Sequence, residues 1–450
     1  MATTGRPNIL LLIPDQHRWD FMETTPGLPV RMPNVEELAA RGIRFNQAIV
    51  NSPLCAPSRA SLASTRNYHR TGVEDNFQDY PLDLPTFYQA LRTAGYRTGG
   101  VGKFDLHKNT SDWGPDGKRC LDEWGFSDGV DNEGKWDMVW NCADEPKGPY
   151  SGYLHGRDLM AAHVADMATR APGTDEHRNY GQTAPSPLPE EAYSDNWLTE
   201  HGLDIINGFP TDTPWFLQVN FTGPHEPNDV TARMHARWQG VEFPEAHRNT
   251  QHNRDFHNRV RQNYSAILEN IDRQIGRLLE AVAARGELDN TIVVYSSDHG
   301  EMLGDNDLWA KTHPNQGSIA VPLVVAGPGV QKGVKSDALV ALIDLAGTFV
   351  DYGEATLPPG SDALSLRPTL EGTATTHREH VFSGMTREGT TLDWDLVWDG
   401  RYKLVIHRQA DDELFDLDND PFENDNIIDS APDVAARLRE LLEIELARSD

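Results

Sequence analysis

Residues 51–66, NSPLCAPSRASLASTR, place a cysteine directly before a predicted helix. Pro57 suits the first turn of a helix, because its ring fixes φ and its missing N–H would have had no partner there. Residues 58–62 continue as helix, so Cys55 lies at a helix N-terminus, where free N–H groups and the helix dipole favour an anion. Arg59 adds a planar cation nearby. We interpret the stretch as a nucleophile beside an anion site; the alternative is a reduced Cys55 packed at a helix start.

Polar side chains follow four predicted strands. The strands and the residues after them are 9–13 with Asp15 and Gln16, 98–101 with Lys103, 215–221 with His225, and 291–295 with Asp298 and His299. Buried runs of this kind are typical of parallel strands that are covered on both faces. Open α/β sheets place their sites at the carboxyl ends of such strands. We therefore expect these side chains to converge at one edge of a sheet.

Helices alternate with these strands over most of the chain. The predicted helices are 35–41, 84–94, 195–207, 264–284 and 337–350, and 321–326 is one more buried strand. From about 109 to 195 the periodicity fades, which indicates loops or a lid, and 245–259 is expected to be a solvated connection. The pattern predicts an α/β domain over 1–371, with a large mixed, mostly parallel sheet flanked by helices.

The end of the chain has a different pattern. Short predicted strands at 381–385, 396–398 and 402–407 precede a final helix at 433–447. This pattern favours a small C-terminal domain over 372–450, with an antiparallel sheet and one packed helix.

The composition limits the partners and the compartment. In 450 residues, Lys and Arg total 40 and Asp and Glu total 69, a formal net charge of −29. This charge repels nucleic acid and anionic membranes, so neither is an expected partner. Three cysteines fit a reducing compartment, and the aliphatic run before Pro14 is too short for a secretory or membrane segment. We expect a cytoplasmic protein. Its acidic composition is compatible with a homo-oligomer.

Several motifs carry a resemblance to a known family. CAPSR at 55–59 resembles the CxPSR signature of the sulfatases, GYRTGGVGK at 95–103 resembles their second signature, and SDHGEMLGDNDLWAK at 297–311 resembles their metal and lysine segment. PNILLLIPDQ at 7–16 and DELFDLDNDPFEN at 412–424 extend the match over nearly the whole chain. The chain is identified as a member of the formylglycine-dependent type I sulfatases of the alkaline phosphatase superfamily.

The resemblance implies one metal site. The implied ligands are Asp15, Gln16, Asp298, His299 and the modified Cys55 side chain. Ca²⁺ is the expected ion, with Mn²⁺ or Mg²⁺ as alternatives, because a glutamine and a histidine replace two anionic oxygen ligands. Judged from the residues alone, aspartates at strand ends also serve as helix caps or turn formers.

The resemblance further implies that a formylglycine-generating enzyme oxidises Cys55 to formylglycine. The hydrate of this aldehyde would supply the hydroxyl that attacks sulfur and displaces the alcohol. Arg59 would orient the nucleophile, and Lys103, His225 and Lys311 would bind the sulfuryl oxygens. Either His225 or Lys311 would also protonate the departing alkoxide.

The chain departs from the family pattern after Lys103. Many sulfatases have a histidine two residues further on, whereas this chain has Asp105 there and its nearest histidine is His107. Either residue could be the base that restores the aldehyde, and we favour His107 because its intrinsic pKa lies near neutrality. Asn76, in GVEDN, is expected either to donate to the substrate or to form a turn.

The implied function is a metal-dependent sulfuric ester hydrolase that acts on a small anionic substrate, an aryl or carbohydrate sulfate monoester. One alternative is a phosphonate monoester or phosphodiester hydrolase of the same superfamily, since a tetrahedral anion beside a metal suits phosphorus as well as sulfur. Another alternative, of a different class, is a catalytically silent anion-binding protein in which Cys55 stays a thiol.

Overall fold

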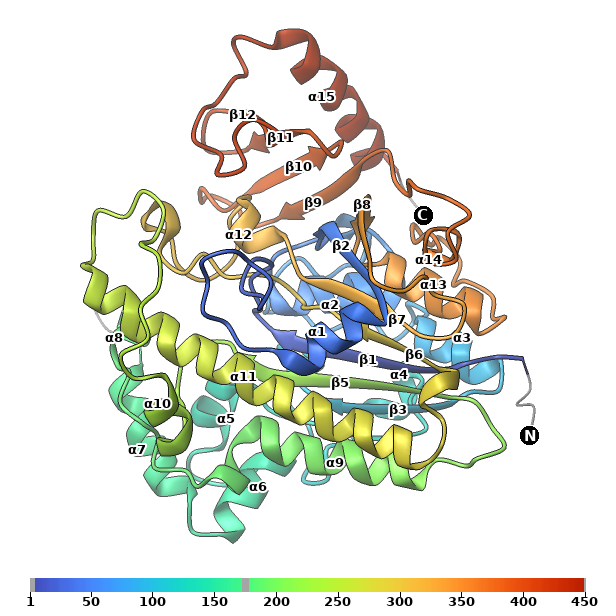
Figure 1. Ribbon diagram of the computed structural model, residues 1–450, viewed down its shortest axis with the longest axis vertical. Coiled ribbons are helices and arrows are strands. Elements are labelled where there is room, and N and C mark those ends of the chain that lie inside the picture. Colours follow the sequence, from blue (N-terminus) through green and yellow to red (C-terminus); the bar gives the residue numbers. More distant parts are fainter. Residues whose placement is uncertain (1–4, 172–177, 449–450) are drawn as a thin grey trace.

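A computed structural model describes residues 5–171 and 178–448. An eight-stranded sheet forms the centre of its larger part (Figure 1). From edge to edge the strands are β4 (Asp128–Asp131), β3 (Arg97–Gly102), β5 (Trp215–Pro224), β1 (Asn8–Asp15), β6 (Thr291–Tyr295), β7 (Leu323–Ala326), β2 (Gly42–Ile49) and β8 (Val334–Ala341). Neighbouring strands are parallel except at β7, which runs antiparallel to β6 and β2. This mixed, mostly parallel sheet confirms the predicted α/β class.

Helices cover both faces of the sheet, and the central strand β1 shows why. All of its residues are buried, and successive side chains of a strand point to opposite faces. Leu10 and Leu12 pack in one core, to which α1 (Pro33–Ala40), α9 (Ser194–Gly208), α10 (Ala232–Trp238) and α11 (Arg254–Ala284) contribute. Ile9 and Leu11 pack in a second core, to which α2 (Cys55–Ser64), α3 (Phe87–Thr93) and α13 (Asp344–Tyr352) contribute.

A separate four-stranded antiparallel sheet follows near the end of the chain (Figure 1). Its order is β12 (Glu413–Asp416), β11 (Tyr402–His407), β10 (Trp394–Trp398) and β9 (Val381–Met385). One face packs on α15 (Pro432–Leu446), through Leu404 and Leu438 among others. The opposite face, with Trp394, shares an apolar cluster with Leu54 and Ile319 of the larger part. This arrangement agrees with the predicted antiparallel sheet and helix, while the boundary at residue 372 stays a prediction.

Three predicted segments differ from the structure. Residues 337–341 belong to strand β8, and the following helix begins only at Asp344, whose carboxylate accepts the Ala341 N–H at 3.1 Å. Helix α11 begins at Arg254 and not at 264, because the Asn253 side chain caps it by accepting the Phe256 N–H at 2.9 Å.

The third difference is the segment expected to be loops between about 109 and 195. It contains short helices, which are α4 (Leu121–Trp124), α5 (Lys135–Cys142), α6 (Pro149–Gly156), α7 (Met160–Arg170) and α8 (Arg178–Gly181). Helices of one to three turns offer too few repeats for a clear 3.6-residue period, so tertiary packing decides them. Among residues 5–171 and 178–448, none of the helices has the length and apolar character needed to cross a membrane.

Candidate active site

Cys55 is the first residue of helix α2 and is almost completely buried, with an exposed fraction of 1%. The start of the helix is fixed from two sides. The Asn76 side chain accepts the Ala56 N–H at 3.0 Å, and the Ser58 hydroxyl donates to the Asp298 carbonyl oxygen at 2.5 Å. The structure therefore places Asn76 next to Cys55, at the end of the helix where an anion is favoured.

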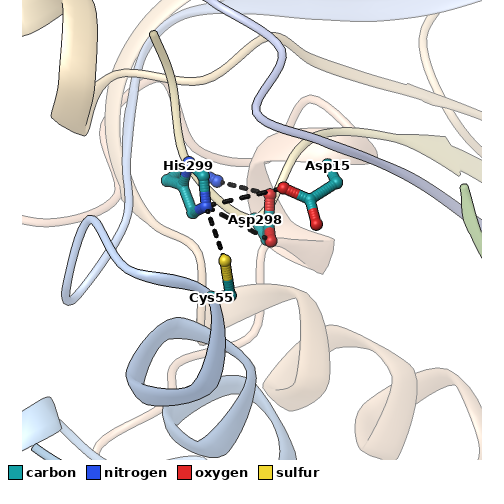
Figure 2. A group of neighbouring side chains, drawn as sticks. All are labelled: Asp15, Cys55, Asp298 and His299. Atoms are coloured by element: carbon teal, nitrogen blue, oxygen red, sulfur yellow. Dashed lines mark hydrogen bonds and ion pairs between the residues drawn. The ribbon is translucent and has the colours of Figure 1, made fainter. Parts of the chain in front are cut away.

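Four side chains, brought together from distant parts of the chain, form a cluster that includes Cys55, as Figure 2 shows. They are Asp15 at the end of β1, Cys55 itself, and Asp298 and His299 after β6. One potential ligand atom from each lies within 4.8 Å of those of the others, and all four residues are buried. The predicted convergence at the carboxyl ends of β1 and β6 is thus observed.

The neutral ring of His299 carries its proton on Nδ1, the ring nitrogen that lies outside this cluster. Its Nδ1 lies 3.0 Å from the Gly300 carbonyl oxygen, which can only accept, so Nδ1 donates and Nε2 carries the lone pair. Nε2 lies 3.4 Å from Cys55 Sγ and 3.6 Å from oxygens of Asp15 and Asp298. Burial lowers the pKa of His299, but the neighbouring Asp298 and Cys55 together outweigh it, so the pKa is raised. The cluster therefore favours a cation at its centre, either a proton or a metal.

Buried cations lie against both Asp15 and Asp298. Arg59 lies 2.8 Å from Asp298 and 3.5 Å from Asp15, so the guanidinium that follows the cysteine faces both carboxylates. Burial raises the pKa of Asp15, but Lys103, His225 and Arg59 together hold it well below its usual range. Arg59 is therefore placed to orient the carboxylates around Cys55.

Lys103 borders the other side of Cys55. Its Nζ contacts Asp15, lies 3.6 Å from Cys55 Sγ and lies 3.1 Å from Asp105. Burial raises the pKa of the Cys55 thiol, but Lys103 and Lys311 outweigh this effect and hold it well below its ordinary value. This position therefore stabilises a negative charge.

Lys311 and His225 form a pair beside the cluster. The Lys311 ammonium donates to Gln16 Oε1 at 2.7 Å and lies 2.5 Å from His225 Nε2. Burial lowers the pKa of Lys311, but Cys55 and Glu226 outweigh it and raise that pKa. Because a charged lysine has no acceptor, His225 Nε2 accepts, and His225 Nδ1 donates to the Glu226 carbonyl oxygen at 2.5 Å. Gln16 thus turns its amide oxygen to Lys311, and its assignment as a metal ligand stays a prediction.

The structure separates the two residues that were alternatives for the base. His107 Nε2 is bound to Asp131 at 2.6 Å, and its ring stacks on Trp124 with 5.5 Å between centroids. Asp105 instead lies with its carboxylate on Lys103, in a left-handed backbone conformation with φ of 53°. Of the two, Asp105 is the residue that shares a cation with the cluster.

Sequence reasoning missed a buried acidic pair behind the site. Gln16 Nε2 donates to Glu226 at 2.8 Å and also contacts Glu301, which accepts the Tyr180 hydroxyl at 2.9 Å. Burial, with a contribution from Glu226, raises the pKa of Glu301. Glu301 also accepts the Ala310 N–H at 2.6 Å and so holds the segment that leads to Lys311. One signal in the sequence could have identified this pair, because each glutamate lies one or two residues after a predicted site histidine.

Comparisons with known proteins agree with this geometry. The Sulfatase family matches residues 7–355, and the C-terminal region of N-sulphoglucosamine sulphohydrolase matches residues 304–448. A choline-sulfatase of Rhizobium meliloti (strain 1021) is 28% identical over 457 residues, which cover 95% of this chain and 83% of that protein. An arylsulfatase of Clostridium perfringens (strain 13 / Type A) is 27% identical over 458 residues, which cover 94% of this chain and 91% of that protein.

The fold is also shared with a solved structure. Phosphonate monoester hydrolase SpPMH from Silicibacter pomeroyi superposes with a TM-score of 0.82 at 22% identity, covering 99% of this chain and 96% of that chain. The family match spans most of the chain, and the cysteine signature lies within it at the centre of a buried polar cluster. The chain therefore belongs to the sulfatase family of enzymes.

Proposed function

We propose that the protein hydrolyses a small organic sulfate monoester, an aryl or carbohydrate sulfate, with one divalent metal ion and a formylglycine made from Cys55. The observation that carries this proposal is the position of Cys55, at a helix start between a carboxylate cluster and Lys103. The formylglycine-generating enzyme would be its partner during maturation. A cytoplasmic location and a homo-oligomer stay predictions.

The residues present fit a metal ion. Asp15 Oδ1 is buried and has no hydrogen-bond donor among the residues that the structure describes. The His299 Nε2 lone pair faces the same space, and two carboxylates border it. Asp15, Asp298, His299 and residue 55 would hold the ion, with Gln16 as a further proposed ligand. When bound, the ion would act as a Lewis acid that lowers the pKa of a hydroxyl nucleophile.

The cationic side chains have separate proposed tasks. Lys103, His225 and Lys311 would bind the sulfuryl oxygens, because their polar atoms border residue 55 or one another. Lys311 Nζ lies 2.5 Å from His225 Nε2. If one of the two residues protonates the departing alkoxide, the other can return a proton to it. Asn76 would donate to the substrate through its amide nitrogen, since its oxygen already accepts from the backbone.

Formylglycine also fits position 55. Lys103 and Lys311 stabilise an anion there, and residue 55 lies at the positive end of the dipole of helix α2. The hydrate of the aldehyde would supply the attacking hydroxyl.

Substrate comparison tests the proposal. We expect protein co-expressed with a formylglycine-generating enzyme to hydrolyse 4-nitrophenyl sulfate with a higher kcat/KM than the matched phosphate, phosphodiester and phenylphosphonate esters. A faster phosphonate or phosphodiester reaction would instead establish the alternative hydrolase. Mass spectrometry of the peptide covering residues 51–66 should show the aldehyde in the same sample. An unmodified Cys55 thiol in protein from the native host would rule out the proposed formylglycine mechanism.

The two alternatives for the base give a second prediction. We now propose Asp105, because its carboxylate shares Lys103 with the cluster, whereas His107 is bound to Asp131. Asp105→Asn should lower kcat by about 10²-fold, the usual contribution of a general base. His107→Asn serves as the matched control and should change kcat less while lowering Tm, since it weakens a buried ion pair. The reverse order of effects on kcat would return the role to His107.

A further inference from the structure

Lys311 lies between two residues in an unusual backbone conformation. Ala310 has φ of 59° and Thr312 has φ of 76°, both in the left-handed region that non-glycine residues rarely adopt. Such conformations persist only where surrounding contacts fix them. The contacts that fix this segment therefore also decide where the Lys311 ammonium lies.

Trp394, on β10 of the second sheet, makes one of these contacts. Its indole N–H donates to the Thr312 carbonyl oxygen at 3.0 Å, and the side chain is fully buried. On the other side, the Thr312 N–H donates to the Pro53 carbonyl oxygen at 3.0 Å. Thr312 is thus fixed between the second sheet and the segment that leads into Cys55.

A buried ion pair of the second sheet makes the next contacts. Lys403, on β11, donates to the Pro314 carbonyl oxygen at 2.6 Å and contacts Glu423. Glu423 in turn accepts the Gln316 N–H at 2.9 Å and the Asn315 side-chain amide at 3.2 Å. Three peptide groups after Lys311 are therefore bound by side chains of the C-terminal sheet and the turn that follows it, through the Thr312 and Pro314 carbonyl oxygens and the Gln316 N–H.

We propose that Trp394 and the pair of Lys403 and Glu423 are positioning residues, which hold the Lys311 ammonium against His225 and Gln16. This inference rests on the proposed role of Lys311. Apolar packing alone does not account for the contact, as a second tryptophan on the same strand shows. Trp398 is also buried in the cluster shared by the two sheets, yet within residues 5–171 and 178–448 its indole N–H has no hydrogen-bond partner.

Trp394→Phe therefore has a matched control in Trp398→Phe. Both variants lose an indole from the same strand, but only the first leaves the Thr312 carbonyl oxygen without its donor. We expect Trp394→Phe to lower kcat by about tenfold and to weaken the binding of inorganic sulfate, because small displacements of a binding group are costly. Trp398→Phe should keep wild-type kcat. Equal kcat values for the two variants would overturn the proposal.

A double-mutant cycle separates positioning from general damage. Trp394→Phe should lose its effect when it is combined with Lys311→Ala, since the residue acts through that lysine. The same cycle is measured on the binding of inorganic sulfate, so that it does not depend on slow turnover by Lys311→Ala. An equal effect of Trp394→Phe in both backgrounds would contradict the proposal. Glu423→Gln should lower kcat in the same way as Trp394→Phe. A wild-type kcat for Glu423→Gln would show that the ion pair has no positioning role.

These results are distinguishable from a failure of the proposed function. If the wild-type protein hydrolyses no sulfate ester, the proposed function fails, while the sulfate-binding cycle still measures coupling between Trp394 and Lys311. If sulfate esters are hydrolysed and the cycle shows no coupling, only the positioning role fails.

Discussion

Cys55→Ala is expected to lower kcat/KM for 4-nitrophenyl sulfate by about 10⁴-fold or more, the loss that follows removal of an enzymatic nucleophile. The methyl group can neither be oxidised to an aldehyde nor carry a hydroxyl. The Cys55 Sγ lies 3.6 Å from the Lys103 ammonium and 3.4 Å from His299 Nε2, so the substitution removes the proposed nucleophile from the cluster. Initial rates with the purified variant, after circular dichroism confirms its fold, give the measurement.

The other two cysteines provide the controls. Cys142 is buried in the first core and Cys120 is partly buried beside the second, and neither belongs to the cluster around Asp15. Cys142→Ala and Cys120→Ala should therefore keep kcat within about twofold of wild type while losing some stability from the smaller side chain. Turnover by Cys55→Ala close to that of these controls would show that the nucleophile lies elsewhere.

Removal of divalent ions should have the second largest effect. We expect dialysis against EDTA to lower kcat by about 10³-fold or more, since such an ion contributes several kcal/mol of charge stabilisation. The loss should be reversed by Ca²⁺, Mn²⁺ or Mg²⁺, and the ion that restores most activity identifies the preferred metal. The same ion should raise Tm by about 3 °C at a concentration well above its dissociation constant.

Two aspartate variants locate this ion. Asp298→Asn keeps the size of the side chain but removes one of the two carboxylates that face His299, so the ion should no longer raise Tm. Asp416→Asn changes a carboxylate at the end of β12, which is bound by Arg401 at 2.7 Å, and it should keep the full ion effect. Full activity of the EDTA-treated protein would show that no metal is needed at the cluster around Cys55. Loss of the ion effect in Asp416→Asn alone would show that the ion binds elsewhere.

Much of the fold and of the site could be predicted because the relevant signals are local. Continuous apolar runs indicated the central strands, and the polar residues directly after β1 and β6 indicated which edge would carry the cluster. The helix start at Cys55 followed from the position of Pro57. These signals predicted that Asp15, Asp298 and His299 converge, while only the resemblance implied that they bind a metal; the structure places them around Cys55.

The remaining features depend on partners that are distant in sequence. Asp131 binds His107 from 24 residues away, and the intrinsic pKa of a histidine carries no information about such a partner. Strand β8 is recruited by pairing with β2, which lies almost 300 residues earlier, and pairing of this kind overrides local propensity. The contact of Trp394 with Thr312 likewise joins two motifs whose sequences carry no sign of each other.

The apolar cluster that the two sheets share has a practical consequence for recombination between family members. Leu54 precedes Cys55 by one residue, and its neighbours in that cluster include Trp394 and Leu396. A chimera that takes its last strands from a relative would thus change the surface on which the cysteine segment rests.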